Sequence, residues 1–272
     1  MTIEQRLTNT KGKKQMAINI DKMRNKLDRA EGKGGKGSDV FWKPEEGEQT
    51  IRILPTEDGD PFREFWFHYN LGANRGFLSP KKMYGEQDAL DEFVRTLFNQ
   101  GTADSTKMAK ELMARQRFFS AVIVRGEEDK GVRLWGYGKN AYKELLGLVL
   151  NPDYGDITDP TTGTDLVIKY GKSSGVTFPQ TTISPRRRPS PVFENDASGA
   201  KVKQLLSSIP NYDEVFAESR KTPEEVNRML EAWLAGDERK DVEKFGAAVK
   251  AMPDGVNVDS KLKELLDKDI PF

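Results

Sequence analysis

The strongest constraint on the fold is a two-residue alternation of apolar and polar side chains that recurs from Phe41 onward. In TIRILP, Ile51 and Ile53 point one way while Thr50 and Arg52 point the other, as in a strand with one buried face. Further alternating or apolar runs are FREFWFHYNL (62–71), FFSAVIVR (118–125), VRLWGY (132–137), DLVIKY (165–170) and VTFPQTTI (176–183). Short strands with Gly-rich turns predict a small barrel or sandwich.

Helical patterns interrupt and follow these strands. Residues 86–117 contain EQDALDEFVRTLF and TKMAKELMARQ, and NAYKELLGLVL (140–150) lies between two expected strands. After the proline-punctuated segment 184–192, TPEEVNRMLEAWLAG predicts a helix with Thr222 as N-cap and Glu225 completing a capping box. The sequence therefore predicts an α+β chain with a helical C-terminal region.

Composition excludes several classes of protein. No stretch approaches the roughly eighteen apolar residues of a membrane span, and the N-terminus lacks the apolar region of a secretory signal. Zero cysteines exclude disulfides and thiolate zinc sites and fit a reducing compartment. We therefore expect a cytosolic protein.

Charge is distributed unevenly along a chain whose formal net charge is zero. Residues 1–40 hold ten Lys/Arg against five Asp/Glu, whereas residues 194–272 hold twelve against seventeen. A basic head and an acidic tail favour head-to-tail self-association, or a tail that competes with an anionic ligand. The alternative interpretation is that this uneven distribution arises by chance in a chain rich in charged residues.

An enzyme has few candidate residues here. There is one histidine, and neither a GxxxxGK[ST] phosphate loop nor a GxSxG motif. His68, Asp88 and Asp91 define the alternative of a metal-dependent nucleic-acid-processing enzyme. A purely structural assembly protein is a third possibility.

Aromatic residues with neighbouring cations favour binding of single-stranded nucleic acid, in which each base stacked on a ring contributes about 1–3 kcal/mol. In VRLWGY the alternation places Arg133, Trp135 and Tyr137 on one face. Other candidates of this kind are Trp66, Arg115, Arg117, Phe118 and Phe119. Packing under a helix is the alternative role for Trp135.

Four segments resemble a known family: FWKPEEGEQTIRILP (41–55), FHYNL (67–71), RFFSAVIVR (117–125) and VRLWGYGKNAYKELLGLV (132–149). They are similar to the single-stranded DNA-binding (helix-destabilising) proteins of T-even-like bacteriophages. The resemblance implies an oligonucleotide-binding (OB-fold) β-barrel that binds DNA cooperatively during phage replication, recombination and repair, in the cytoplasm of an infected bacterial host. It also implies a basic arm for contact with neighbouring copies and an acidic region that recruits replication and recombination proteins.

These expectations divide the chain into three parts. Residues 1–40 form the arm and a Gly-rich linker, with Lys11, Lys13 and Lys14 as self-association candidates. Residues 41–193 form the OB-fold core, with a helical subdomain inserted at about 79–117. Residues 194–272 form the acidic helical region.

The family implies a zinc site held by one histidine and three cysteines, and this chain departs from it. Ser79, Asp88 and Asp91 stand where the cysteines would be, beside His68. Ser and Asp do not reproduce a soft thiolate site, so we expect no zinc and no other cofactor. The helix at 86–98 would instead pack its apolar face against the barrel.

The resemblance also implies specific DNA contacts. It assigns Arg52, Arg117 with Phe118 and Phe119, and Phe178 to the DNA surface. Phe118 and Phe119 point to opposite faces of a regular strand, so only one of them is expected to stack on a base. We add Lys81 and Lys82 in the insertion as phosphate clamps.

The chain ends in DKDIPF, which resembles the C-terminal tip of bacterial single-stranded DNA-binding proteins. In that tip a terminal Phe fills an apolar pocket on a partner while its carboxylate meets a basic residue. The residues expected to bind a partner are Asp267, Asp269, Ile270, Pro271 and Phe272.

Overall fold

The structure, a computed structural model, describes residues 40–72, 76–172 and 179–235. Eight strands of these residues form one sheet: β1 (Phe41–Trp42), β2 (Gly47–Ile53), β3 (Arg63–His68), β4 (Phe77–Leu78), β5 (Arg115–Val124), β6 (Arg133–Tyr137), β7 (Leu166–Gly171) and β8 (Gln180–Pro185).

The described helices are α2 (Pro80–Tyr84), α3 (Ala89–Gln100), α4 (Ala103–Leu112), α5 (Lys139–Val149), α6 (Ala200–Ser207), α7 (Tyr212–Val215) and α8 (Pro223–Leu234), with short 3-10 turns η2 (Glu128–Lys130) and η3 (Ala217–Ser219). The predicted α+β class is confirmed. The capping box of α8 is also confirmed, since the Thr222 hydroxyl and the Glu225 carboxylate each accept a hydrogen bond from the other's backbone N–H.

The strands follow the order β1-β6-β5-β2-β7-β8, and β3 pairs with β4 and β5 beside this path. The long strand β5 joins the two parts of the sheet, because its residues 115–119 pair with β3 and its residues 122–124 pair with β2. Within the described ranges β1 and β8 do not pair with each other. The OB-fold barrel therefore stays a prediction.

The main apolar core lies under α5, on one face of the sheet. Ile51 and Ile53 both belong to it, as the alternation in TIRILP predicts, and Leu145 of α5 covers them. Trp135 and Phe118 belong to the same core and are 1% exposed. The strand face on which we expected base stacking is thus the inward face.

A second core forms among the helices of the insertion. The apolar side of α3 packs on α4 and on the C-terminal helix α8, with the rings of Phe93 and Trp233 at 6.2 Å. Leu71 and Phe77, next to β3 and in β4, also join this cluster. The expectation that this helix packs against a barrel is therefore corrected, because its main partners are two other helices.

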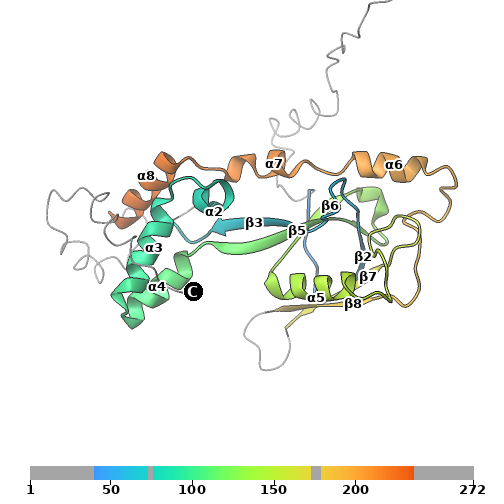
Figure 1. The fold of residues 1–272 in the computed structure, drawn as a ribbon, viewed down its shortest axis with the longest axis horizontal. Helices are drawn as coiled ribbons and strands as arrows, with labels where there is room; N and C mark the ends of the chain where they lie inside the picture. The colour runs from blue at the N-terminus through green and yellow to red at the C-terminus, as the bar shows by residue number, and fades with distance from the viewer. Residues whose placement is uncertain (1–39, 73–75, 173–178, 236–272) are drawn as a thin grey trace, which may run out of the picture. The chain divides into compact units, whose positions relative to one another are not determined.

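A third cluster fixes the C-terminal segment to the sheet. Phe65 and Phe67 of β3 lie on one face with Phe119, and Phe216 packs on all three rings at centroid distances of 4.6 to 5.5 Å. Figure 1 shows α6, α7 and α8 following one side of the sheet. The segment after residue 193 thus covers β3 and then reaches the insertion.

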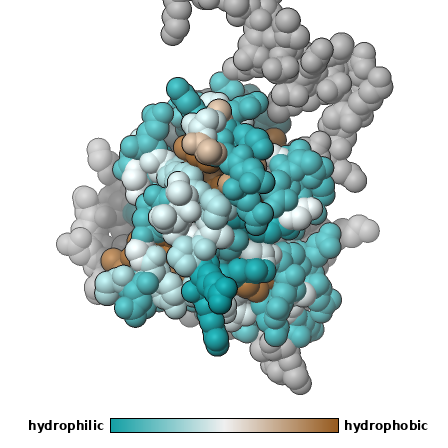
Figure 2. Space-filling model, turned by 90° about the vertical axis from the view of Figure 1, so that its right-hand side faces the viewer, coloured by the Kyte–Doolittle hydropathy of each residue, from teal (hydrophilic) through white to brown (hydrophobic). Residues whose placement is uncertain are grey.

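The side of the molecule drawn in Figure 2 is largely polar. Figure 2 shows one side on which hydrophobic residues form only small patches. Among the described residues, the exposed large apolar side chains are Tyr84, Phe98, Met113, Val149 and Leu150. No helix in the described part is long and apolar enough to span a membrane.

Candidate nucleic-acid interface

A groove of about 860 Å³ opens where β1, β6 and the first residues of β8 meet the N-terminus of α5. Its lining residues come from six elements of the fold, β1, β5, β6, α5, β7 and β8. The pairing of β1 with β6 places Phe41 beside Leu134 and Trp42 beside Trp135 at one wall. The groove therefore depends on long-range strand pairing.

Aromatic side chains form much of the groove wall. Phe41 and Tyr170 are half-buried, so part of each ring is open to solvent. Trp42, Phe119 and Trp135 also line the groove, but they are at most 8% exposed and present only small portions of their rings. Phe41 and Tyr170 are therefore the best placed of these rings to stack on a base.

Cations stand beside these rings. Lys43, Arg117 and Lys139 line the groove, and none of them forms an ion pair within the described part of the chain. Among the described lining residues the one carboxylate, that of Glu144, accepts a hydrogen bond from the backbone N–H of Ile183 at 3.0 Å. The groove thus carries an excess of positive charge next to flat apolar surfaces.

Gly136 of β6 allows Phe119 to approach the groove floor. A Cβ atom at residue 136 would lie 2.6 Å from the Phe119 ring, which is closer than real contacts allow. Phe119 stands directly opposite Gly136 in the β5–β6 ladder. The glycine in the WGYGK segment is therefore needed for close packing.

The family described as gp32 DNA binding protein like matches residues 45–233, well over half of the chain. The chain belongs to this family. No individually curated protein matches the sequence. The gp32-like match includes β2 to β8 and the helices from α2 to α8 except the last residue of α8, so most of the groove lies within it.

Four of the predicted DNA contacts line the groove, two from β5 and two from β6. Arg117 and Phe119 both line it, and they share one face of β5. Phe118 lies on the other face, where its ring stacks on Tyr142 at 3.7 Å and is 1% exposed. Phe118 is therefore a core residue, and the prediction that it contacts a base is corrected.

The predicted stacking face of β6 is also corrected. Trp135 and Tyr137 reach the groove only at their edges, and their rings pack in the main core. Burial raises the pKa of the Tyr137 hydroxyl, which hydrogen-bonds the Ser120 hydroxyl at 2.8 Å. Arg133 is 7% exposed and pairs with Glu127 at 2.5 Å, so its charge is already matched.

Three further candidates lie outside the groove. The Trp66 indole donates to Glu64 at 2.5 Å, and the Lys82 ammonium lies 5.4 Å from the centroid of its ring. Lys81 pairs with Asp91 at 3.1 Å. Trp66 lies on the opposite face of β3 from Phe65, and neither Lys81 nor Lys82 lines the groove. The phosphate clamp predicted from these two lysines is therefore not assembled there.

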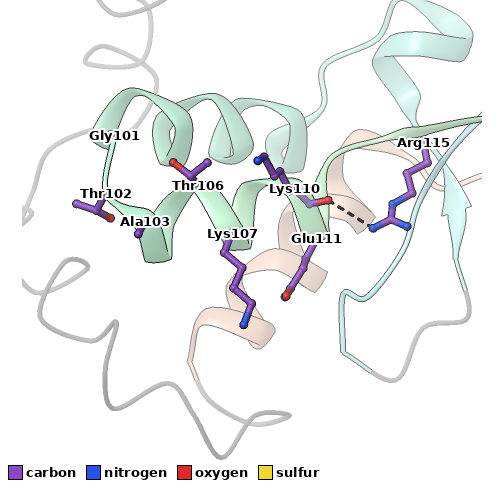
Figure 3. Close-up of a pocket in the computed structure, with 8 residues that line it drawn as sticks. All are labelled: Gly101, Thr102, Ala103, Thr106, Lys107, Lys110, Glu111 and Arg115. Carbon is purple, nitrogen blue, oxygen red and sulfur yellow. Dashed lines mark hydrogen bonds between the residues drawn. The ribbon is translucent and has the colours of Figure 1, made fainter. Parts of the chain in front are cut away.

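Arg115 lines a different cavity, which opens along α4 (Figure 3). Several other predicted residues lie outside the described ranges. These are Phe178, the arm residues Lys11, Lys13 and Lys14, and the tip residues Asp267, Asp269, Ile270, Pro271 and Phe272.

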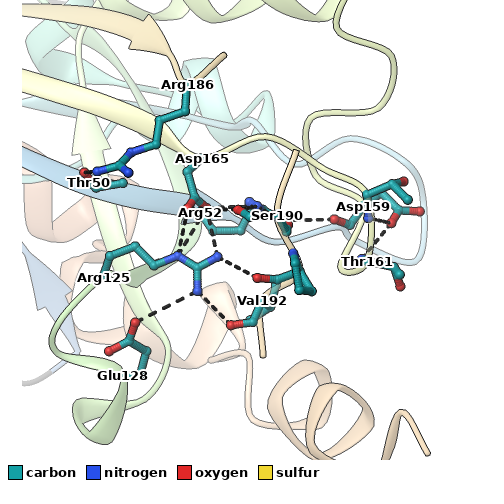
Figure 4. Close-up of polar contacts among 12 residues, drawn as sticks. Thr50, Arg52, Arg125, Glu128, Asp159, Thr161, Asp165, Arg186, Ser190 and Val192 are labelled. Atoms are coloured by element: carbon teal, nitrogen blue, oxygen red, sulfur yellow. Dashed lines mark hydrogen bonds and ion pairs between the residues drawn. The ribbon is translucent and has the colours of Figure 1, made fainter. Parts of the chain in front are cut away.

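Arg52 is the clearest correction, because it is fully buried in a polar cluster (Figure 4). Its guanidinium pairs with Asp165 at 2.9 Å and donates to the backbone carbonyls of Ser190 at 2.6 Å and Asp159 at 3.1 Å. Burial lowers the pKa of Arg52, while the charge of Asp165 opposes that shift. Arg52 therefore holds the fold together and does not face solvent.

Sequence reasoning missed Phe41, Lys43 and Tyr170 as groove residues, whereas the pattern does place Lys139 beside an aromatic residue, Tyr142. A signal existed for Phe41 and Lys43, which are adjacent in the FWKP segment, and for Lys139 in YGKN. Tyr170 gave no signal of its own, since only the β7–β8 pairing brings it to the groove beside Thr181.

The residues that the resemblance aligns with zinc ligands form a buried hydrogen-bonded cluster. His68 Nδ1 lies 2.9 Å from the carbonyl of Leu112, and Nε2 lies 3.0 Å from the Asp88 carboxylate. The Ser79 hydroxyl donates to the same carboxylate at 2.6 Å. His68, Ser79 and Asp88 thus come together as their spacing implied, whereas Asp91 pairs with Lys81.

This cluster does not fit a zinc ion. Both nitrogens of the His68 ring are already engaged, and no thiolate is present. In the described ranges no three His, Asp or Glu side chains gather closely enough to hold a metal ion. The same geometry gives no support to a metal-dependent enzyme that uses His68, Asp88 and Asp91.

We predict that Asp165→Ala strongly destabilises the protein. The change leaves Arg52 and Arg125 without the carboxylate they share, and breaking a buried pair of this kind costs about 3–5 kcal/mol. Glu48→Ala, which removes an exposed pair with Lys169, should cost less than about 1 kcal/mol. Urea unfolding of both variants measures the difference, and equal free energies of unfolding would contradict a structural role for the cluster.

Asp88 gives a pH-dependent prediction. Burial alone would raise the pKa of its carboxyl, but hydrogen bonds from His68 and Ser79 and the charge of His68 outweigh it, so the pKa lies below its usual value. A carboxyl with a lowered folded-state pKa stabilises the fold above its unfolded-state pKa of about 3.9 and loses this contribution as pH falls through the folded-state pKa.

Asp88→Asn should therefore flatten the fall in unfolding free energy below about pH 4 and cost about 1–3 kcal/mol at pH 7. Asp91→Asn, on the same helix, removes only partly exposed pairs and serves as the control. Urea unfolding at several pH values tests this, and an Asp88→Asn profile parallel to that of the unchanged protein would refute it.

Proposed function

We propose that this protein binds single-stranded DNA without reading its sequence, with the strand lying in the groove. The observation that carries the proposal is the combination of partly open rings, Phe41 and Tyr170, with cations that have no ion-pair partner among the described residues. Membership of the gp32-like DNA-binding family supports the same ligand.

The mechanism follows from the chemistry of the groove. Rings stack on the flat face of any base, and each stacked base contributes about 1–3 kcal/mol. Lys43, Arg117 and Lys139 would neutralise phosphates along the strand, which makes binding dependent on salt. Because stacking and charge do not distinguish one base from another, the binding is sequence-independent.

Several finer features belong to this proposal. We place the groove on an OB-fold barrel and assign cooperative filament formation to the basic arm with Lys11, Lys13 and Lys14. The protein would act in phage DNA replication, recombination and repair, in the cytoplasm of an infected bacterium. The cluster of His68, Ser79 and Asp88 would serve in place of the family's zinc site.

Titration with oligo-dT, followed by tryptophan fluorescence, tests the proposal. Trp42 and Trp135 line the groove, so a bound strand should quench the signal, whereas duplex DNA should quench it little. The log–log slope of affinity against salt should be about −0.7 per neutralised phosphate. Equal quenching by duplex, or binding that ignores salt, would contradict it.

Two variants separate stacking from charge. Tyr170→Ala should weaken dT binding by about 1–3 kcal/mol with an unchanged salt slope, because a ring is lost but no charge. Lys139→Gln should reduce the magnitude of the slope by about 0.7. Lys201→Gln, on the exposed side of α6, is the control and should change neither quantity.

We also propose that the DIPF tip recruits replication or recombination proteins. Pro271 limits the entropy lost on capture, and Phe272 offers an apolar ring that a partner can bury. Deleting Asp269 to Phe272 should leave dT affinity nearly unchanged and abolish pull-down of such partners. Pull-down that survives the deletion would show that the tip is not the recruiting element.

A further inference from the structure

A second basic cavity lies along α4, apart from the groove. It has a volume of about 580 Å³, and its lining includes three cations, Lys107, Lys110 and Arg115, against one carboxylate, Glu111 (Figure 3). All three cations are exposed. None of them forms an ion pair with another described residue, so their charges are available to an anion.

The cavity is built from two elements that are fixed relative to each other. Lys107 and Lys110 stand one helical turn apart on α4, and Arg115 follows at the start of β5. The Arg115 guanidinium donates to the carbonyl of Lys110 at 3.5 Å, which holds it over the end of the helix (Figure 3). Asn70 also joins the β3 end to α4 through the carbonyl of Glu111 at 3.3 Å.

The strand β5 connects this cavity with the groove. Arg115 and Arg117 lie on the same face of β5, about 6.8 Å apart along the strand. Arg117 lines the groove and Arg115 lines the α4 cavity. The two basic sites are therefore neighbours along one strand.

Tyr69 lies close to both arginines. Burial raises the pKa of its hydroxyl, and the positive charges of Arg117 and Arg115 oppose that shift. The ring stacks on Phe67 at 5.9 Å and is half-buried. Because Phe67 pairs with Arg115 in the β3–β5 ladder, this aromatic surface lies beside Arg115, at the end of β5 that leads to the α4 cavity.

We propose that the α4 cavity is a second phosphate-binding subsite for the DNA strand that occupies the groove, reached past Arg117, Tyr69 and Arg115. This inference rests on the proposed function, because it extends the path of the same strand. Phosphates beyond the groove would contact Lys107, Lys110 and Arg115, so a long strand uses both sites and a short strand uses the groove alone.

The test compares oligo-dT of about 4 and about 16 nucleotides, the two ends of the range for single-stranded DNA modules. The full-length double variant Lys107→Gln/Lys110→Gln should bind the short oligonucleotide as the unchanged protein does. For the long one its affinity should fall, and the magnitude of its salt slope should drop by about 1.4, which is two phosphate contacts. The double variant Lys201→Gln/Lys203→Gln on α6 is the matched control and should behave as the unchanged protein.

Other outcomes overturn the inference in distinguishable ways. An unchanged slope and affinity for the long oligonucleotide would show that the cavity does not contact DNA. An equal loss for both lengths would show that it is not a separate subsite. If the unchanged protein binds neither oligonucleotide, the proposed function itself fails, whereas binding of both with no effect of the α4 variant removes only this inference.

Discussion

A single carboxylate buried between two arginines determines how the chain leaves the sheet. Asp165, just before β7, pairs with Arg52 of β2 and with Arg125, which follows β5. Both arginines also donate to carbonyls of residues 190–192. Three neighbouring strands and the segment after β8 are thus joined at one point. Removing one member of a buried charge cluster leaves another charge without its partner, which costs stability. Because both arginines also hold residues 190–192, the cluster fixes where the C-terminal segment starts.

That direction matters for the groove. The segment that leaves the cluster places Phe216 against the rings of Phe65, Phe119 and Phe41, and the last two line the groove. Further along, α8 completes the core of the insertion through Val226 and Trp233. The helical region after residue 193 therefore supports the aromatic wall of the groove and the helices that carry the α4 cavity. Its described part belongs to the same compact unit as the groove.

Much of this fold was predictable from local patterns. Alternation located the strands, helical spacing located α3, α4, α5 and α8, and the capping residues located the start of α8. Alternation separates two faces of a strand but does not say which face is covered. Both faces are covered here, one by α5 and the other by residues 190–192 and Phe216. Arg52 and Trp135 were therefore assigned to an open surface although both are buried.

Whether a given arginine is available to DNA depends on partners that sequence neighbours do not reveal. Arg52 meets Ser190, 138 residues away, whereas Arg117 is half-buried, lines the groove and forms no ion pair with another described residue. The two side chains have the same chemistry, and both lie in strands rich in apolar residues. An arginine that is buried needs a carboxylate and carbonyls to offset its lost hydration, and one that is not buried keeps its charge for a ligand. Long-range pairing thus decides which cations hold the fold and which line the groove.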